Sequence, residues 1–267
     1  MRIRPKHALG QNFLQDENHA EFIVQTLDIK PGDVILEVGP GLGVLTHRIV
    51  RTGVRMFAVE MDKGMFGILE ETLGKQWKNL TLINSDILDV EIEKLEPHIT
   101  KIVSNLPFQI SSPFTFQMLD YKGFEKAVIT YQLEFAQRLV ASPGSKDYSR
   151  LSVMAYVKAQ AKILRRIKAG AFFPPPKVES AVVEIIPRPS PPFHMTDEAY
   201  FAKLVESLFS QRRKTIKNSL KNCSRALSSD RDRFVEALGG LKNKDRRPEE
   251  LTPEEINDIS EKLLLLR

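Results

Sequence analysis

Five short apolar runs in the first half of the chain most constrain what this sequence can fold into. They occupy residues 34–38, 55–60, 80–83, 101–104 and 126–131. Stretches with apolar residues at helical spacing lie between several of them, for example at 42–49 and 63–73. Strands that alternate with helices form a mostly parallel sheet with helices on its faces. The sequence therefore predicts a doubly wound α/β fold.

The pattern changes after residue 160. Residues 161–167 and 180–186 are predicted as strands with no helix between them, which indicates an antiparallel pair at the end of the sheet. The proline-rich residues 187–192 are typical of a linker. Beyond them the chain is predicted as helices at about 198–210, 212–227, 230–238 and 253–265. The expected domains are residues 1–188, with the sheet, and residues 189–267, a small C-terminal all-helical domain.

The 267 residues include one cysteine, Cys223, so no disulfide can form within the chain. No apolar run approaches the roughly 20 residues of a membrane-spanning helix, and the basic start of the chain is not followed by the apolar segment of a secretory signal. A cytoplasmic protein without membrane association is expected. Cys223 falls on the apolar face of the predicted helix at 212–227, which favours a core position.

Basic residues are unevenly distributed, although the net charge is only +5. No acid occurs between Asp147 and Glu179 or between Glu206 and Asp230, and both segments are rich in Lys and Arg. If these blocks and the basic first residues (Arg2, Arg4, Lys6) converge, they suit a phosphate backbone. A solvated helix face is the alternative for any single block. The residues predicted to contact nucleic acid are Arg150, Arg165, Arg166, Lys177, Arg212, Arg213, Lys214 and Lys217.

A glycine-rich turn, Gly39-Pro-Gly-Leu-Gly43, follows the first predicted strand, where folds of this class bind nucleotides. Glu60 ends the second strand and is placed to accept hydrogen bonds from ribose hydroxyls. The dinucleotide pattern Gly-x-Gly-x-x-Gly would need a third glycine where Val44 stands. This departure argues against NAD and favours a nucleoside ligand without a pyrophosphate, such as S-adenosylmethionine. A plain strand-to-helix turn is the alternative.

Two further strand ends carry polar residues. Asp86 follows the third strand, where a carboxylate suits the exocyclic amine of a bound adenine, although a lone Asp there is more often a cap or turn residue. The fourth strand runs into Asn105-Leu-Pro-Phe108. Because the carboxyl ends of parallel strands meet at one edge of a sheet, this motif is expected beside the cofactor site.

Asn105-Leu-Pro-Phe108 resembles the motif of methyltransferases that act on exocyclic amino groups. Together with other motifs it makes the chain similar to the small-subunit rRNA adenine N6,N6-dimethyltransferases, the KsgA family. The motifs that carry this resemblance lie at residues 10–14, 37–41, 105–113, 143–148, 173–178 and 209–214. Ser111-Ser-Pro113 looks more like archaeal and eukaryotic members than bacterial ones. The resemblance implies a Rossmann-like methyltransferase sheet and an RNA-binding helical domain.

The resemblance also implies a reaction. Two methyl groups pass from S-adenosyl-L-methionine to N6 of each of two adjacent adenosines, in a hairpin loop near the 3′ end of small-subunit rRNA, during subunit biogenesis. A monomer without a metal is expected, with rRNA or the immature small subunit as partner. The residues implied to bind the cofactor are Asn12, Leu14, Gly39, Gly41, Glu60, Asp86 and Asn105.

The predicted catalytic residues, Asn105, Leu106, Pro107 and Phe108, have a chemical rationale of their own. The amino nitrogen of adenine is a poor nucleophile because its lone pair is delocalised into the ring. The Asn105 side-chain oxygen and the Leu106 carbonyl are suited to accept its two hydrogens. Pro107 stiffens the loop, and Phe108 offers a face on which a flipped base can stack. Many members of this class have Tyr where Phe108 stands.

Two rival functions fit much of the same pattern. One is a large-subunit rRNA adenine methyltransferase of the macrolide-resistance type, whose members usually have Ile where Leu106 stands. The other is a non-catalytic ribosome-assembly factor that retains the fold. The glycine turn, Glu60, Asp86 and Asn105 argue against a decayed site.

Overall fold

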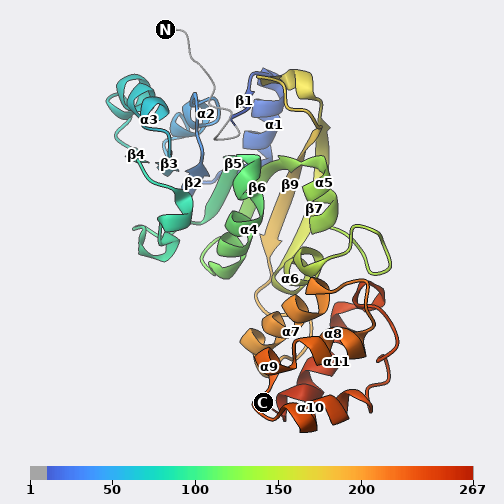
Figure 1. Cartoon of the computed structure of the whole chain (residues 1–267). Helices are drawn as coiled ribbons and strands as arrows, with labels where there is room; N and C mark the ends of the chain where they lie inside the picture. Colours follow the sequence, from blue (N-terminus) through green and yellow to red (C-terminus); the bar gives the residue numbers. More distant parts are fainter. Residues whose placement is uncertain (1–10, 267) are drawn as a thin grey trace. The chain divides into compact units, whose positions relative to one another are not determined.

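A computed structural model describes residues 11–266, in which the predicted strands form one seven-stranded sheet (Figure 1). The strand order is β4-β3-β2-β5-β6-β9-β7. Their bounds are β2 (Val34–Val38), β3 (Arg55–Val59), β4 (Leu80–Ile83), β5 (Lys101–Asn105), β6 (Lys126–Gln132), β7 (Ala159–Ile167) and β9 (Ser180–Pro187). The strands from β4 to β6 pair in parallel, and β9 is antiparallel to β6. The predicted mostly parallel sheet with an antiparallel end is confirmed.

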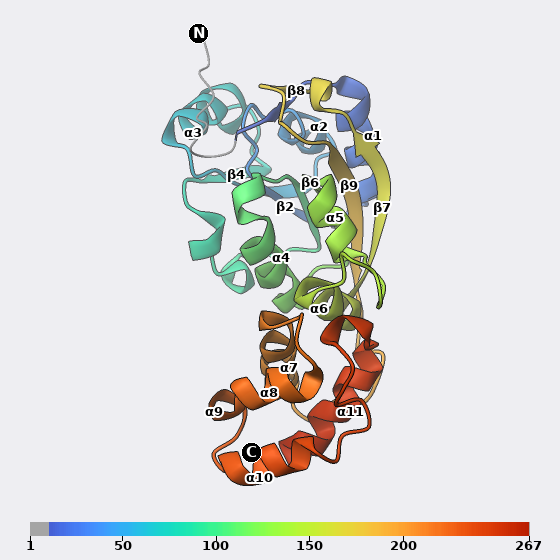
Figure 2. The same ribbon diagram turned by 45° about the vertical axis from the view of Figure 1, so that its right-hand side comes forward.

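The strand β9 lies between β6 and β7, although it follows β7 in the sequence. Figure 2 shows β9 and β7 side by side at this end of the sheet. Ser180 of β9 is opposite Gln132 of β6, and Ile185 is opposite Ala127. Four residues of β9, 180–183, are buried, so the strand carries the apolar sequence expected of an interior position. The strand β7 forms the edge and reaches the sheet only through β9.

The helix α1 (Glu17–Leu27) is capped by Asp16, whose carboxylate accepts a hydrogen bond from the His19 N–H at 3.0 Å. Its residues Ala20, Ile23 and Leu27 are buried in the core with side chains of the central strands. The other helices along this part of the chain are α2 (Thr46–Val50), α3 (Lys63–Leu69), the π-helical turn η2 (Glu70–Gly74), α4 (Ser111–Asp120) and α5 (Leu133–Leu139). Short 3₁₀ turns are η3 (Ile87–Asp89), η4 (Ile92–Lys94), η5 (Phe108–Ile110) and η6 (Ala169–Ala171).

A two-stranded ribbon outside the main sheet is not predicted by the sequence. β1 (Phe13–Leu14) pairs antiparallel with β8 (Phe172–Phe173), with Phe13 opposite Phe173 and Leu14 opposite Phe172. Leu14 and Phe172 both belong to the hydrophobic core. The Gln15 N–H donates to the Ala171 carbonyl at 2.8 Å. The segment before α1 is therefore fastened to the loop between β7 and β9.

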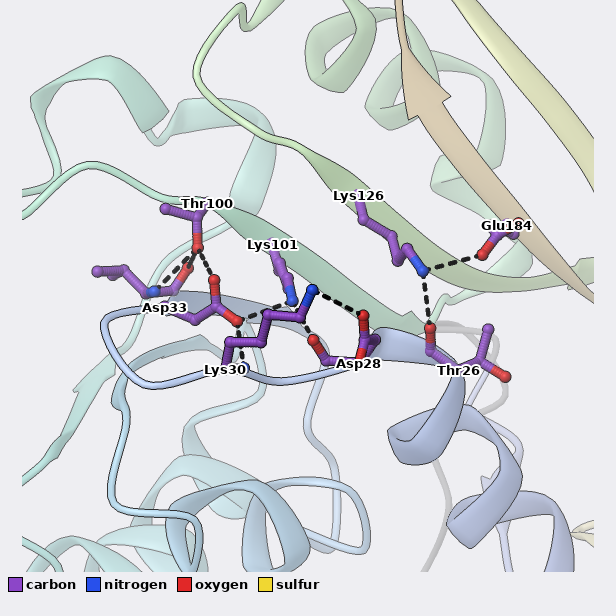
Figure 3. Close-up of polar contacts among 9 residues, drawn as sticks. Thr26, Asp28, Lys30, Asp33, Thr100, Lys101, Lys126 and Glu184 are labelled. Carbon is purple, nitrogen blue, oxygen red and sulfur yellow. Dashed lines mark hydrogen bonds and ion pairs between the residues drawn. The ribbon is translucent and has the colours of Figure 1, made fainter.

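A buried ion pair lies at the amino ends of β2 and β5 (Figure 3). Lys101 Nζ is 2.8 Å from Asp33 Oδ2, and 5% and 10% of the two side chains are exposed. Asp33 also accepts hydrogen bonds from the Thr100 hydroxyl and the Lys30 N–H. Burial alone raises the pKa of Asp33, but these hydrogen bonds and the one from Lys101 outweigh it and lower that pKa.

The Lys101 ammonium also donates to the carbonyl of Asp28, the residue that ends α1. Nearby, Lys126 donates to the Thr26 carbonyl at 3.3 Å and pairs with Glu184 of β9 (Figure 3). Carbonyls at a helix C-terminus lack partners within the helix and carry a partial negative charge. The two lysines therefore tie the end of α1 to β5 and β6.

The chain forms two compact units: residues 11–136 with 160–187, and residues 137–159 with 188–266. The chain leaves the first unit for the last time after Pro187. The second unit contains α6 (Arg150–Lys158), α7 (Glu198–Ser210), α8 (Ile216–Asn222), α9 (Ser224–Leu227), α10 (Arg231–Leu238), η7 (Pro248–Glu250) and α11 (Pro253–Leu264). Among residues 11–266, none of the helices is long and apolar enough to cross a bilayer.

The single helix predicted over 212–227 is wrong. Residues 211–215 form a turn, and α8 begins only at Ile216, where Thr215 caps it by accepting a hydrogen bond from the Asn218 N–H. A second break separates α8 from α9 at Cys223, which is half-buried rather than a core residue. Arg213 therefore lies outside the helix that carries Lys217 and Lys221. Arg212 lies in this turn, and its side-chain contacts are described below.

Candidate active site

One cavity of about 290 Å³ opens at the carboxyl ends of β2, β3, β4 and β5. Its wall includes every residue predicted to bind the cofactor or to act in catalysis: Asn12, Leu14, Gly39, Gly41, Glu60, Asp86, Asn105, Leu106, Pro107 and Phe108. These residues come from five separate segments of the chain. Four of these segments follow the parallel strands β2 to β5, which end at the same edge of the sheet, and the fifth, with Asn12 and Leu14, lies at β1. Their individual roles stay predictions.

The glycine-rich turn is pressed against two other walls of the cavity. Gly39 has a φ of +65°, and a Cβ there would lie 3.3 Å from Pro107 Cδ. Gly41 has a φ of +56°, and a Cβ there would lie 3.0 Å from the ring of Phe13. Residues other than glycine rarely adopt these backbone angles. Glycine is thus needed both for the turn and for the close approach of β1 and the Asn105–Phe108 loop.

Glu60 holds the glycine-rich turn through its carboxylate. Its Oε2 accepts a hydrogen bond from the Gly41 N–H at 3.0 Å, and its Oε1 accepts one from the Asp62 N–H at 2.8 Å. Burial raises the pKa of Glu60, and these two hydrogen bonds partly oppose that rise. A carboxylate has about four acceptor positions, so Glu60 still has acceptor capacity for a ligand hydroxyl.

The neighbouring carboxylates have different partners. Asp86 caps η3, because its Oδ1 accepts from the Leu88 N–H at 3.0 Å, and it also lines the cavity. The two interpretations of this residue, a cap and a cavity residue, are therefore compatible. Asp62 accepts a hydrogen bond from Gln11 Nε2 at 3.0 Å, which ties the segment before β1 to the end of β3. No group of three His, Cys, Asp or Glu within residues 11–266 is arranged to hold a metal.

Asn105 ends β5, and its amide is already oriented. Its Nδ2 donates to the backbone carbonyl of Asn12 at 2.8 Å. The Oδ1 atom is then the part of the amide left to accept a hydrogen bond from a ligand. Leu106 is buried, whereas Phe108 is half-buried and begins η5. The contact with Asn12 was not predictable from spacing, because the two residues are 93 positions apart.

Glu37 lines the cavity but is not among the predicted site residues. Its side chain is buried, and its Oε2 accepts a hydrogen bond from the Thr46 hydroxyl at 2.6 Å. Burial raises the pKa of Glu37 from 4.5 to about 8; the Thr46 hydrogen bond opposes this rise and the charge of Glu60 adds to it. The sequence feature that could have pointed to Glu37 is its position, since it is an acid inside the apolar strand β2, which ends at the glycine-rich turn.

We expect the free energy of unfolding of the ligand-free protein to fall as the pH rises from about 4.5 to 8. In this interval the folded protein keeps a proton on Glu37 that the unfolded chain has released. Glu37→Gln replaces the titrating carboxyl with a neutral amide and should make the free energy of unfolding depend less on pH. The variant should therefore be more stable than wild type at pH 8 but not at pH 5. Thermal melting across this range tests this. Glu70→Gln, at an exposed position of η2, is the control and should follow wild type; parallel curves for all three proteins contradict the assignment.

Some of the basic residues predicted to bind RNA already contact other groups of the protein, whereas others are exposed. Arg212 pairs with Glu249 at 2.8 Å and donates to the Lys146 carbonyl at 2.9 Å. Arg150 lies 3.3 Å from Glu206, and the guanidinium of Arg165 stacks 3.6 Å from the ring centre of Phe22. The residues whose side chains are exposed are Arg166, Lys177, Arg213, Lys214 and Lys217. Arg2, Arg4 and Lys6 lie outside the described residues.

Two solved structures of methyltransferases share this fold. A dimethyladenosine transferase from Plasmodium falciparum is 25% identical, with a TM-score of 0.75 over 95% of this chain and 96% of that one. The 23S rRNA methyltransferase ErmE is 26% identical, with a TM-score of 0.68 over 94% of this chain and 99% of that one. The sheet, with its cavity beside the glycine-rich turn, is thus that of a Rossmann-like methyltransferase.

The family model for ribosomal RNA adenine dimethylases matches residues 3–262. The probable ribosomal RNA small subunit methyltransferase A of the archaeon Thermococcus gammatolerans is 42% identical over 257 residues, which cover 96% of this chain and 88% of that protein. The chain belongs to the ribosomal RNA adenine dimethylase family, in its archaeal type, and is an rRNA adenine methyltransferase.

Proposed function

We propose that this enzyme uses S-adenosyl-L-methionine to dimethylate N6 of two adjacent adenosines in a hairpin loop near the 3′ end of small-subunit rRNA, during assembly of the small subunit. The observation that carries the proposal is the single cavity that joins the glycine-rich turn, Glu60 and Asp86 to the Asn105–Phe108 loop. The small subunit is favoured because the 42% identical relative is named for it, whereas ErmE, named for 23S rRNA, is 26% identical.

The cavity suits this cofactor. The glycine-rich turn forms part of the cavity wall, and Glu60 beside it has acceptor capacity for ribose hydroxyls. Asp86 stands on the next strand end, at the place for an adenine amine, with the buried Ile87 beside it. When bound, the cofactor supplies an electrophilic methyl group attached to a sulfonium.

The protein's part in the reaction is to orient the target amine. In the first transfer the Asn105 Oδ1 and the Leu106 carbonyl accept its two hydrogens, and in the second transfer one of them accepts the hydrogen that remains. These hydrogen bonds favour a pyramidal nitrogen whose lone pair points at the methyl group. Phe108 stacks on the flipped base, an interaction typically worth ~1–3 kcal/mol. Attack makes the nitrogen acidic, so its proton passes to water without a dedicated base.

Methyl transfer from labelled cofactor tests the proposal directly. Unmethylated small ribosomal subunits should accept label, and digestion of their rRNA should release N6,N6-dimethyladenosine from two adjacent positions. Large subunits and naked DNA should accept none. Labelling of large subunits in preference to small ones would support the macrolide-resistance type of reaction and contradict the proposal.

Replacing Glu60 with alanine should weaken cofactor binding by on the order of 1–3 kcal/mol, because the ribose hydroxyls lose a charged acceptor and the Gly41 N–H loses its partner. Titration calorimetry measures the change. Glu70→Ala removes an exposed carboxylate of the same charge and should bind the cofactor as wild type does. Equal affinities for folded Glu60→Ala and Glu70→Ala would remove Glu60 from the cofactor site.

The exposed cations Arg213 and Lys217 should contribute to rRNA binding through phosphates. Replacing both with Gln should weaken binding and flatten the slope of log affinity against log salt by about 0.7–0.9 for each lost contact, with cofactor affinity unchanged. Replacing Arg231 and Arg233, two exposed cations of α10, with Gln changes the charge equally and is the control. If both double variants keep the wild-type slope, the RNA docks elsewhere, for example on Arg166 and Lys177.

A further inference from the structure

Phe173 is a large apolar side chain that the fold leaves 48% exposed. A single exposed aromatic residue is common on protein surfaces and by itself indicates nothing. Its position distinguishes it, since it lies in β8, directly opposite Phe13 of β1. In an antiparallel pair, opposed residues point to the same face, with their Cβ atoms about 4.5–5.5 Å apart.

The two faces of the β1–β8 ribbon have different surroundings. Leu14 and Phe172 are both buried in the hydrophobic core, and Leu14 also contributes to the cavity wall. On the other face, Phe13 forms part of the cavity wall, and its ring lies against Gly41. Phe173 shares that face but is not part of the cavity wall. Because it is 48% exposed and lies opposite a residue of the wall, we place it at the rim of the cavity.

The segment that presents Phe173 is stiff and positively charged. Three prolines, 174–176, follow it directly and restrict the backbone. Lys177 and Val178, which come next, are both exposed. Lys162, Arg166 and Lys168 on or next to β7 are exposed as well, and no acid occurs between residues 160 and 178. An aromatic face on a proline-rich loop that continues directly to an exposed lysine matches a nucleotide, whose base stacks and whose phosphate pairs with a cation.

We propose that Phe173 stacks on an unpaired base of the rRNA that flanks the target adenosine, while Lys177 contacts a neighbouring phosphate. The inference rests on the proposed function. Phe108, inside the cavity, faces the flipped base. Phe173, at the rim, contacts the RNA strand from which that base has been flipped. Stacking is tolerant of base identity, so this contact holds the RNA strand in place and does not read its sequence.

The test compares variants of the full-length enzyme in methylation of unmethylated small ribosomal subunits. Phe173→Ala should raise KM for the subunits by roughly five- to a hundredfold, with kcat at saturating subunits and cofactor affinity close to wild type. Phe173→Trp should retain the wild-type KM, and Phe173→Leu should behave like Phe173→Ala, because stacking requires an aromatic face. Ile186→Ala is the matched control: Ile186 is also exposed and apolar, but it lies near the start of β6, at the opposite end of the strands from the cavity.

Each outcome decides the inference. An unchanged KM for Phe173→Ala, or an equal increase for Ile186→Ala, overturns it. Full rescue by Phe173→Leu shows an apolar contact with a protein instead of a base, and altered cofactor affinity shows a structural role in the cavity; both overturn it as well. Failure of the proposed function is separate, because wild-type enzyme would then not methylate small subunits at all.

Discussion

Replacing Asn105 with alanine is expected to lower the rate of methyl transfer by on the order of a thousandfold, while rRNA binding persists. The substitution removes the oxygen that would orient the target amine. It also leaves the Asn12 carbonyl without the hydrogen bond that it receives from Asn105 Nδ2. Docking of the RNA depends on a surface much larger than this one side chain, so single-turnover rates should fall far more than affinity for the subunit.

The control for this prediction is Asn105→Asp. Aspartate keeps an acceptor oxygen in the cavity but cannot donate to the Asn12 carbonyl at neutral pH, so it should retain part of the activity that alanine loses. Filter binding to small subunits and single-turnover methylation separate the two effects. Wild-type turnover by Asn105→Ala would contradict the mechanism, and loss of RNA binding by that variant would give Asn105 a role in docking.

Replacing Lys101 with alanine should lower the free energy of unfolding by about 3–5 kcal/mol. The change leaves Asp33 buried without its cation and frees the Asp28 carbonyl at the end of α1. Urea denaturation of the ligand-free protein measures the loss. Lys30→Ala is the control, because the Lys30–Asp28 pair is largely exposed and should contribute less than about 1 kcal/mol. Equal losses for the two variants would contradict the structural role of Lys101.

The sheet was largely predictable because each of its parallel strands has a recognisable local sequence pattern. Each of the parallel strands from β2 to β5 is a short apolar run that ends at a glycine, an acid or an asparagine, and burial on both faces requires such runs. β1 and β8 were not predictable, since a strand of two residues has no period and is defined only by its partner. The break in the helix at 211–215 was not predicted, since no glycine or proline marks it; Arg212 in this turn makes a hydrogen bond and an ion pair with residues distant in the sequence.

The candidate site was also predictable only in part. The wall residues Gly39, Glu60 and Asn105 stand at strand ends, so topology alone brings them to one edge of the sheet. The protonation of Glu37 and the orientation of the Asn105 amide depend on burial and on contacts from other segments. Those properties arise only in the assembled fold, and no spacing in the sequence encodes them.

The ribbon formed by β1 and β8 has a consequence for an enzyme that is itself made on a ribosome. Asn12, Phe13 and Leu14 leave the ribosome early, but their partner strand at Phe172–Phe173 is synthesised about 160 residues later. Until then one wall of the cavity has no strand to fix it, and β7 has no place in the sheet before β9 follows. A nascent chain shorter than about 187 residues therefore lacks a finished pocket, so no methylation is expected from chains below that length.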